Sequence, residues 1–241
     1  MKKLIFSKKS VLSVIKTSVM LFFISTPILV SAQDNVLTES EKSQGWQLLF
    51  NGKDMSQWRN FKKETISNKW QVQQGEMRLS EKGAGDILTK ERYENFDLKL
   101  DWKISIAGNS GIFIMADEDG SQIYSHAIEI QILDNERHSD NKLASHLSGS
   151  IYDITASPIK SHKPAGEWNS VRIRLFNKSL KIWQNNVLTA DVVVASEKWQ
   201  QLVAKSKFKD WQGFALTEIG HIGLQDHNDA VAFKNIKIKA L

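Results

Sequence analysis

The stretch AIEIQILDN, residues 127–135, combines residue types and spacing that could do acid–base chemistry. Isoleucines alternate with Glu129 and Gln131, the pattern of a strand with one apolar and one polar face. Alternate side chains on a strand stand roughly 7 Å apart on the same face, so the carboxylate and the amide would lie side by side. Such a pair could move a proton and bind a hydroxyl group. The alternative is a solvated sheet face, where Glu and Gln are common.

Asp134 follows Glu129 by five residues, an odd number that would place it on the opposite face of a regular strand. A one-residue bulge between Gln131 and Asp134, displacing Leu133, would bring all three polar side chains onto one face. The resulting Glu-x-x-x-x-Asp pattern on a concave sheet has the form of a glycan-cleaving site. We therefore include Asp134 among the candidate catalytic residues.

The stretch GHIGLQDHND, residues 220–229, carries a second candidate group. Gln225 and His227 share one parity, and His227 lies at the end of the predicted strand. An exposed histidine there could act as an acid or a base near neutral pH; alternatively, a loop carbonyl satisfies it and its role is structural. No acid or third histidine stands at ligand spacing, so we predict no metal ligand and assign no cofactor.

Two further polar residues are candidates for substrate binding. Asn109 belongs to GNSG, residues 108–111, which reads either as a hairpin turn or as a segment that presents Asn109 to a ligand. His138 belongs to a stretch that reads first as a loop. With Gln131 and Gln225, these two complete the predicted substrate-binding set. The chain has no phosphate loop, Gly-x-Ser-x-Gly elbow or metalloprotease helix.

Short strands must position these groups. The clearest is NFDLKLDWKIS, residues 95–105, in which apolar and charged side chains alternate as in an antiparallel strand with one wet face. Other strand-like runs lie at 46–50, 70–74, 76–80, 112–117, 170–176, 179–184, 187–194, 221–227 and 230–241. The alternation slips near Asn235, which predicts a bulge.

Only residues 196–207 predict a helix of useful length, with Ser196 as its N-cap. Many strands, short turns and one short helix indicate an all-β fold, a sandwich or jelly roll of antiparallel sheets, and not a parallel α/β fold.

The first 32 residues predict a secretory signal peptide, cleaved after Ala32. A basic start is followed by an apolar stretch that is short for a membrane span. Residues 33–44 are polar and predict a flexible lead, and 45–241 form one domain. We expect an exported protein, periplasmic in a Gram-negative bacterium, with no membrane insertion after cleavage.

Charge and cysteine content narrow the possible partners. The chain has 32 Lys and Arg against 27 Asp and Glu, but five lysines lie in the first 32 residues, so the remainder balances at 27 to 27. This balance gives no reason to expect nucleic acid or an anionic membrane as a partner. The chain has no cysteine, so a packed core must stabilise the exported domain without disulfides.

Six motifs occur in an order that resembles the 3-keto-disaccharide hydrolase domain family, formerly a domain of unknown function. They are GWQLLFNGKDMSQW (45–58), GNSGIFIM (108–115), IEIQILDNERH (128–138), GSIYDI (149–154), GEWNSVRIRL (166–175) and GHIGLQDHNDAVAFKNIKIKAL (220–241). The resemblance covers nearly the whole chain after residue 44. It implies a concanavalin A-like lectin/glucanase fold, two curved antiparallel sheets with a ligand groove on the concave face, and a carbohydrate substrate.

The resemblance also implies roles for individual positions. Glu129, Gln131 and Asp134 match the family's glutamate–glutamine–aspartate strand, and His227 matches its terminal histidine. At two positions the sequence departs from the residues usual in the family, and both departures bear on the identity of the substrate more than on the fold. Asn228 stands where the family usually has glycine, and asparagine tolerates positive φ. Ala232 stands where the family usually has an aromatic residue.

The function expected from this resemblance is cleavage of 3-keto-glycosides. A base removes the C2 proton, the enolate expels the C1 oxygen, and water adds back to give net hydrolysis. Glu129 or His227 would be the base and the other would assist the leaving group, with Asp134 orienting a neighbour. Two alternatives remain: a non-catalytic carbohydrate-binding module, or a conventional endo-β-glucanase in which Asp134 supplies the second carboxyl group.

Overall fold

The computed structural model describes residues 1, 4, 33–157 and 160–241, and the predicted signal peptide lies almost entirely outside these. The chain divides into a unit over Met1–Ala32 and a unit over Gln33–Leu241, and only the second is described here. Among the described residues, no helix is both long enough and apolar enough to cross a membrane.

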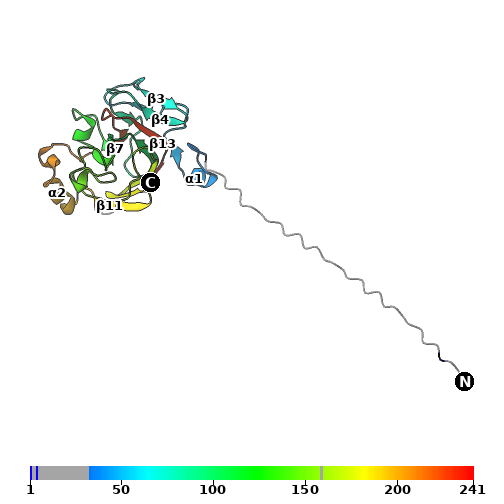
Figure 1. Ribbon diagram of the computed structural model, residues 1–241. Helices are drawn as coiled ribbons and strands as arrows, with labels where there is room; N and C mark the ends of the chain where they lie inside the picture. The colour runs from blue at the N-terminus through cyan, green and yellow to red at the C-terminus, as the bar shows by residue number, and fades with distance from the viewer. Residues whose placement is uncertain (2–3, 5–32, 158–159) are drawn as a thin grey trace. The chain divides into compact units, whose positions relative to one another are not determined.

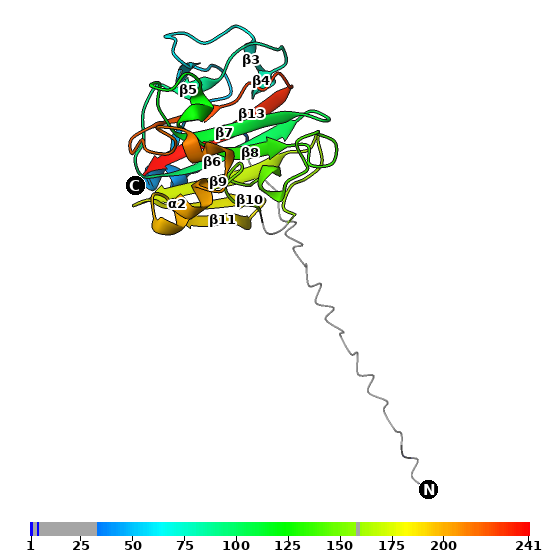
Figure 2. The ribbon, with the colours of Figure 1, turned by 90° about the vertical axis from the view of Figure 1, so that its left-hand side faces the viewer.

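The unit over Gln33–Leu241 is a sandwich of two antiparallel sheets (Figures 1 and 2). The larger sheet has the order β11 (Val187–Val193), β10 (Ser179–Gln184), β9 (Asn169–Phe176), β6 (Phe96–Ile104), β13 (Val231–Ala240), β4 (Glu76–Leu79) and β3 (Trp70–Gln73), and β1 (Gln47–Leu48) also pairs with β13. The smaller sheet has the order β2 (Trp58–Asn60), β5 (Ile87–Thr89), β12 (His221–Leu224), β7 (Asn109–Ala116) and β8 (Ile128–Leu133). The predicted all-β sandwich is confirmed.

The core lies between the two sheets, where the sequence alternation predicts it. The apolar face of β6, from Phe96 to Ile104, is at most 2 % exposed, and so are the three isoleucines of β8. Five of the eight tryptophans are also buried, so the high tryptophan content mainly reflects packing. Burial on this scale can stabilise a domain that has no disulfides.

Helices are few and short. α2 (Glu197–Val203) begins where predicted, and the Ser196 side chain accepts a hydrogen bond from the Trp199 amide at 3.2 Å. The described residues also contain three 3₁₀ turns: η1 (Ile123–Ser125), η2 (Ala144–His146) and η3 (Lys207–Asp210). The predicted helix thus ends earlier than expected, and Lys207 starts a separate turn.

The segment predicted as a flexible lead holds structure of its own. A helix, α1 (Glu39–Ser43), begins with a capping box formed by Thr38 and Glu41. Upstream, Asn35 exchanges backbone–side-chain hydrogen bonds with Asn235 at 2.6 and 2.8 Å. Asn235 has a φ of 55° and lies in the predicted bulge, where the pairing of β13 with β6 shifts register. The bulge is therefore confirmed, and it anchors this N-terminal segment.

Candidate active site

A pocket of about 500 Å³ opens on the outer face of the smaller sheet, away from the sandwich core. Six of the seven predicted site residues line it: Glu129, His227, Gln131, Asn109, Gln225 and His138. The other lining residues are Tyr124, Asp140, Tyr152, Lys207 and Trp211. The polar face of β8 therefore lines a hollow and is not a plain solvated surface.

The alternation of β8 determines which side chains reach the pocket. Glu129 pairs with Phe113 of β7, and Gln131 pairs with Gly111, so the polar side chains of β8 stand on the face opposite its isoleucines. A Cβ on Gly111 would lie 2.5 Å from the Glu129 carboxyl oxygen Oε1. The glycine of the GNSG motif therefore leaves room for the Glu129 side chain.

The outer edge of β8 is covered by the segment that contains the GSIYDI motif. The backbone amides of Gly149 and Tyr152 donate to the backbone carbonyls of Gln131 and Glu129, both at 2.9 Å. The Gln131 amide donates in return to the Ser150 carbonyl at 3.0 Å. This extra pairing buries the edge of the strand and brings the Tyr152 side chain beside Glu129. In the sequence, this motif was identified only through the family resemblance, with no role in the site assigned to it.

Asp134 does not belong to the pocket, and the predicted bulge before it is absent. The pairing of β8 with β7 runs without a register shift from Ile128 to Leu133, so Asp134 keeps the opposite orientation. Its buried carboxylate accepts hydrogen bonds from the amides of Ala107 at 2.7 Å and Glu136 at 3.2 Å. These bonds hold its pKa below the ordinary value despite burial. The expected bulge that would bring Asp134 onto the face of Glu129 and Gln131 is therefore wrong.

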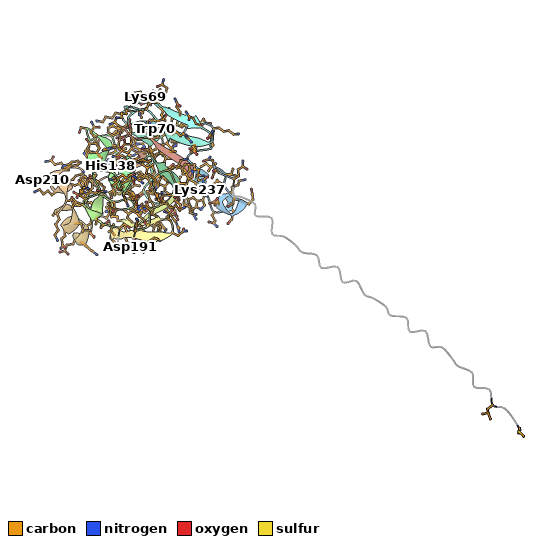
Figure 3. All side chains as sticks on the ribbon, viewed as in Figure 1. Lys69, Trp70, His138, Asp191, Asp210 and Lys237 are labelled. Atoms are coloured by element: carbon orange, nitrogen blue, oxygen red, sulfur yellow. The ribbon has the colours of Figure 1, made fainter. Side chains whose placement is uncertain are left out.

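What Asp134 does is organise the turn that carries His138. The His138 amide donates to the Asp134 carbonyl at 3.0 Å, and the Asp140 amide donates to Nδ1 of His138 at 3.0 Å. A ring nitrogen that accepts a backbone N–H carries no proton, so the proton of neutral His138 is on Nε2. His138 can thus donate a hydrogen bond into the pocket. Figure 3 shows His138 on the same side of the fold as Asp210, away from Lys237 on β13.

Glu129 is the most perturbed acid in the pocket. Only 8 % of the residue is exposed. Burial raises its pKa to about 8, and the nearby carboxylates of Asp86 and Asp140 act in the same direction. The Lys207 ammonium and a hydrogen bond from Gln225 oppose this rise. A carboxyl group with a pKa near neutrality can both accept and release a proton under ordinary conditions.

A network around Asp140 forms one wall of the pocket. Its carboxylate accepts from the Tyr152 hydroxyl at 2.9 Å and faces Nδ1 of His146 at 2.8 Å, while Nε2 of His146 faces Asp153 at 3.0 Å. Burial and the neighbouring Asp140 raise the pKa of Tyr152, so this phenol stays protonated. Tyr152 is therefore a hydrogen-bond donor to Asp140 and not a base.

Lys207 provides the positive charge of the pocket. Its Nζ lies 4.1 Å from the centroid of the Tyr152 ring, and its backbone amide donates to Asp153 at 2.7 Å. Burial lowers the pKa of the ammonium group, while Glu129, Asp153 and Asp140 favour its charged form. An ammonium held near a buried carboxyl group can stabilise negative charge that forms on a ligand between them.

His227 lies at the exposed mouth of the pocket, in a T-shaped contact with His138 at a centroid distance of 6.4 Å. The next residue, Asn228, has a φ of 66°, which explains how asparagine replaces the glycine usual in the resembled family. Ala232, the second departure, is buried in β13 of the other sheet, with no part in the pocket lining.

Two buried acceptors of the pocket lack a partner. The side-chain oxygens Oδ1 of Asn109 and Oε1 of Gln225 accept no hydrogen bond within the described part of the chain. Buried polar atoms are normally paired, so both oxygens await a donor such as a ligand hydroxyl group or water. No group of three or more His, Cys, Asp or Glu within residues 33–157 and 160–241 is arranged to hold a metal ion.

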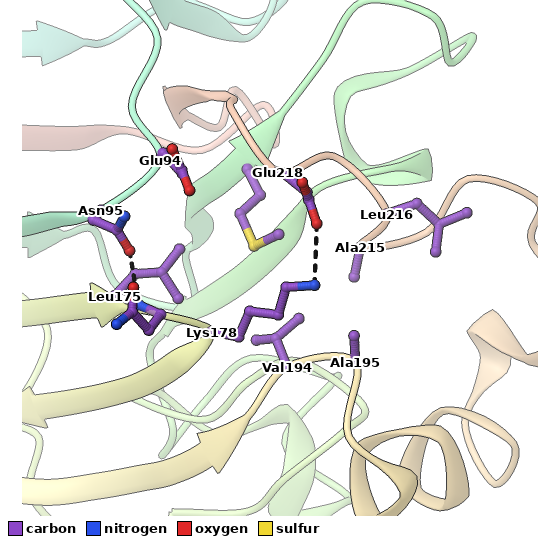
Figure 4. Close-up of a pocket in the computed structure, with 11 residues that line it drawn as sticks. Glu94, Asn95, Leu175, Lys178, Val194, Ala195, Ala215, Leu216 and Glu218 are labelled. Carbon is purple, nitrogen blue, oxygen red and sulfur yellow. Dashed lines mark hydrogen bonds and ion pairs between the residues drawn. The ribbon is translucent and has the colours of Figure 1, made fainter.

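A second hollow of about 470 Å³ lies elsewhere on the fold (Figure 4). Its lining includes the aliphatic side chains of Leu175, Val194 and Leu216, and Lys178 pairs with Glu218 across it at 3.0 Å. The lining contains no histidine, and its lysine is already paired with Glu218, so this hollow is poorly suited to proton transfer.

Residues 45–239 match the family described as the 3-keto-alpha-glucoside-1,2-lyase-like domain. A 3-keto-disaccharide hydrolase of Bacteroides thetaiotaomicron is 31% identical over 244 residues, covering 88% of this chain and 84% of the relative. A crystal structure of a proposed glycosyl hydrolase from Parabacteroides distasonis superposes with a TM-score of 0.82 at 32% identity, covering 87% of this chain and 100% of that one. A second from the same organism has a TM-score of 0.67 at 25% identity, covering 81% and 99%.

Proposed function

The chain belongs to the 3-keto-alpha-glucoside-1,2-lyase-like domain family, and from this membership we propose that it cleaves 3-keto-glycosides by eliminating the group at C1. A glycoside-cleaving role agrees with its relatives. The observation that carries the finer proposal is Glu129, a buried carboxyl group with a pKa of about 8, in one pocket with Lys207, His138 and His227.

Glu129 acts as the base that removes the proton at C2. The ketone at C3 makes this proton acidic, because the electrons left at C2 delocalise onto the ketone oxygen as an enolate. A carboxylate with a pKa of about 8 is a stronger base than an ordinary one, and it is still partly ionised at neutral pH. Burial also removes the water that would compete for the proton.

The enolate oxygen needs donors that are already in place. Lys207 offers an ammonium group and His138 offers Nε2–H, and both line the pocket with Glu129. Charge-assisted hydrogen bonds from such preorganised groups stabilise a developing oxyanion more than water does. Gln131 and Asn109, on the same face of β8 and β7, are suited to hold the sugar hydroxyl groups.

His227 assists the leaving group. The enolate electrons return to form a double bond between C1 and C2, the bond from C1 to the glycosidic oxygen breaks, and the imidazolium of His227 gives its proton to that oxygen. The products are an unsaturated 3-keto sugar and an alcohol. Addition of water across the new double bond gives the 3-keto sugar, and the net reaction is then hydrolysis.

The test compares methyl 3-keto-α-glucoside with methyl α-glucoside, using purified protein in deuterated water. We expect the keto substrate alone to release methanol. Deuterium should appear at C2 of recovered substrate and of the 3-keto sugar formed by addition of water, because the unsaturated intermediate product has no hydrogen at that carbon. Glu129→Gln should abolish both, whereas Glu81→Gln, at an exposed glutamate, should change neither. Equal cleavage of the unoxidised glucoside, or a fully active Glu129→Gln variant, would refute the elimination mechanism.

The role of His227 predicts a dependence on the leaving group. His227→Gln should slow release of an alkoxide such as methanol by about 10²-fold, a typical contribution of a general acid. It should slow release of 4-nitrophenolate far less, because that anion leaves without a proton. Equal losses for both leaving groups would assign His227 another role.

Export is part of the proposal and rests on the sequence pattern of the first 32 residues. Expression of the full chain in a Gram-negative host should yield a periplasmic protein whose N-terminus is Gln33. A protein that stays in the cytoplasmic fraction and keeps its first 32 residues would contradict this prediction.

A further inference from the structure

A smaller hollow of about 250 Å³ adjoins the Glu129 pocket. Three residues line both: Tyr124, Gln225 and His227. Asp86, Phe61 and Gln122 line only the smaller hollow. The two hollows therefore lie next to each other, with His227 in the wall between them.

The Asp86 carboxylate of the smaller hollow is fixed in place with one oxygen available. Its Oδ1 accepts from the Asp226 amide at 2.8 Å, while Asp226 in turn accepts from the Gly85 amide at 2.7 Å. The Asn60 side-chain amide donates to the carbonyls of Ala84, Gly85 and Asp86 at 2.8 to 3.1 Å. Within the described residues, Oδ2 of Asp86 has no hydrogen-bond partner, so it can accept a ligand hydroxyl group.

Independent evidence for a polyhydroxylated ligand comes from the shared wall. Gln225 is 7 % exposed, and its Oε1 lacks a donor within the described residues. An unpaired buried acceptor costs free energy that a ligand hydroxyl group would recover. Phe61 and the exposed Tyr124 add aromatic faces, which suit the apolar faces of sugar rings.

We infer that the Asp86 hollow binds the departing group of the substrate as a second sugar ring, so that the glycosidic bond lies at His227. This assignment rests on the proposed function, which places the 3-keto ring beside Glu129, Lys207 and His138. The leaving oxygen must then lie between the two rings, and His227 is in the wall that both hollows share. A hollow of about 250 Å³ suits one ring and not a longer chain.

The test uses Asp86→Asn and compares a 3-keto-disaccharide with methyl 3-keto-glucoside, whose departing group is too small to fill the hollow. Asparagine keeps the oxygen that accepts from the Asp226 amide, so the loop is preserved. We expect the ratio of kcat/KM for the disaccharide to that for the methyl glycoside to fall roughly ten-fold, mainly through KM. Because Asp86 also influences the pKa of Glu129, the ratio is the proper readout: an effect on the base cancels between substrates.

Gln122→Ala, at an exposed side chain of the same hollow, should lower the ratio by a smaller factor. Asp119→Asn, an exposed aspartate outside either hollow, is the control and should leave it unchanged. An unchanged ratio in both Asp86→Asn and Gln122→Ala would overturn the assignment while leaving the proposed function intact. A wild-type protein that cleaves neither substrate would overturn the proposed function and this assignment with it.

Discussion

Replacing Glu129 by glutamine should abolish activity and, at the same time, stabilise the folded protein. The folded pKa of Glu129 is about 8, against an ordinary value of 4.5. Between these values the folded protein binds more protons than the unfolded chain, so the free energy of unfolding falls as pH rises. Above pH 8 the Glu129 carboxyl group is ionised in both the folded and the unfolded state, and the free energy of unfolding falls no further on its account. Glutamine has no proton to lose and escapes this penalty.

The size of the effect follows from the two pKa values. Each pH unit in the window is worth about 1.4 kcal/mol. The variant should therefore be more stable than the wild type by about 1 kcal/mol at pH 5, about 3 kcal/mol at pH 7 and about 5 kcal/mol at pH 9. Asp86, whose pKa burial raises to about 7, imposes a similar pH dependence on both proteins and largely cancels in the difference.

The assay is urea-induced unfolding of the wild type and Glu129→Gln at these three pH values, followed by tryptophan fluorescence. In a thermal melt of the same two proteins at pH 7, the melting temperature should rise by about 10 °C, given the usual shift per kcal/mol for a domain of this size. Glu81→Gln is the matched control at an exposed position and should show no pH-dependent gain. A Glu129→Gln variant equal to wild type at pH 9, or less stable than it, would refute the claim that Glu129 is held in an unfavourable, desolvated position.

Substitutions at three further positions test the geometry of the pocket and its surroundings. Lys207→Met removes a positive charge that lowers the pKa of Glu129. The rising limb of the pH–rate profile should therefore shift to higher pH by about one unit. An unshifted limb would contradict the proximity of the two groups. Gly111→Ala places a Cβ 2.5 Å from the Glu129 carboxyl oxygen and should cut kcat by about 10²-fold through misplacement of the base; wild-type kcat would count against this. Asp134→Asn should retain most activity, because an amide oxygen still accepts from the Ala107 amide, and a loss as large as that of Glu129→Gln would restore Asp134 as a catalytic candidate. Asp134→Ala should lower the free energy of unfolding in urea by about 1–3 kcal/mol.

The strands and the core were predictable because a strand with one buried face imposes a two-residue period. That period identified β6 and β8 and the face of each that is buried. It also placed Glu129 and Gln131 on one face without any knowledge of their partners. The short strands β2 and β5 were missed, since three residues are too few to show alternation.

The loops account for most of what sequence reasoning missed in the pocket. Asp140 and Tyr152 lie outside the strands, in segments with no period from which an orientation could be read. Lys207 was placed at the end of the predicted helix, but it begins a separate 3₁₀ turn. Their positions depend on long-range contacts, such as the backbone bond from Lys207 to Asp153. The one feature of the sequence that could have pointed to Lys207 and Trp211 as pocket residues is the mixture of aromatic and basic residues at 207–211. The same mixture is common in ordinary amphipathic turns. At Asp134 the prediction failed because it departed from the regular period. It assumed a bulge in order to bring three polar residues onto one face, whereas the strand pairing is regular.

The position of Asp134 bears on the choice between elimination and conventional glycan cleavage. A retaining glucanase needs a carboxylate nucleophile and a carboxylic acid about 5–5.5 Å apart, and in this chain Asp134 was the expected second carboxyl group. Its side chain instead accepts from the amides of Ala107 and Glu136, outside the pocket. Glu129, with its pKa raised to about 8, is in its ionised form a stronger base than an ordinary carboxylate. These properties weaken the case for double displacement, but they suit a single base that removes a carbon-bound proton beside an ammonium group.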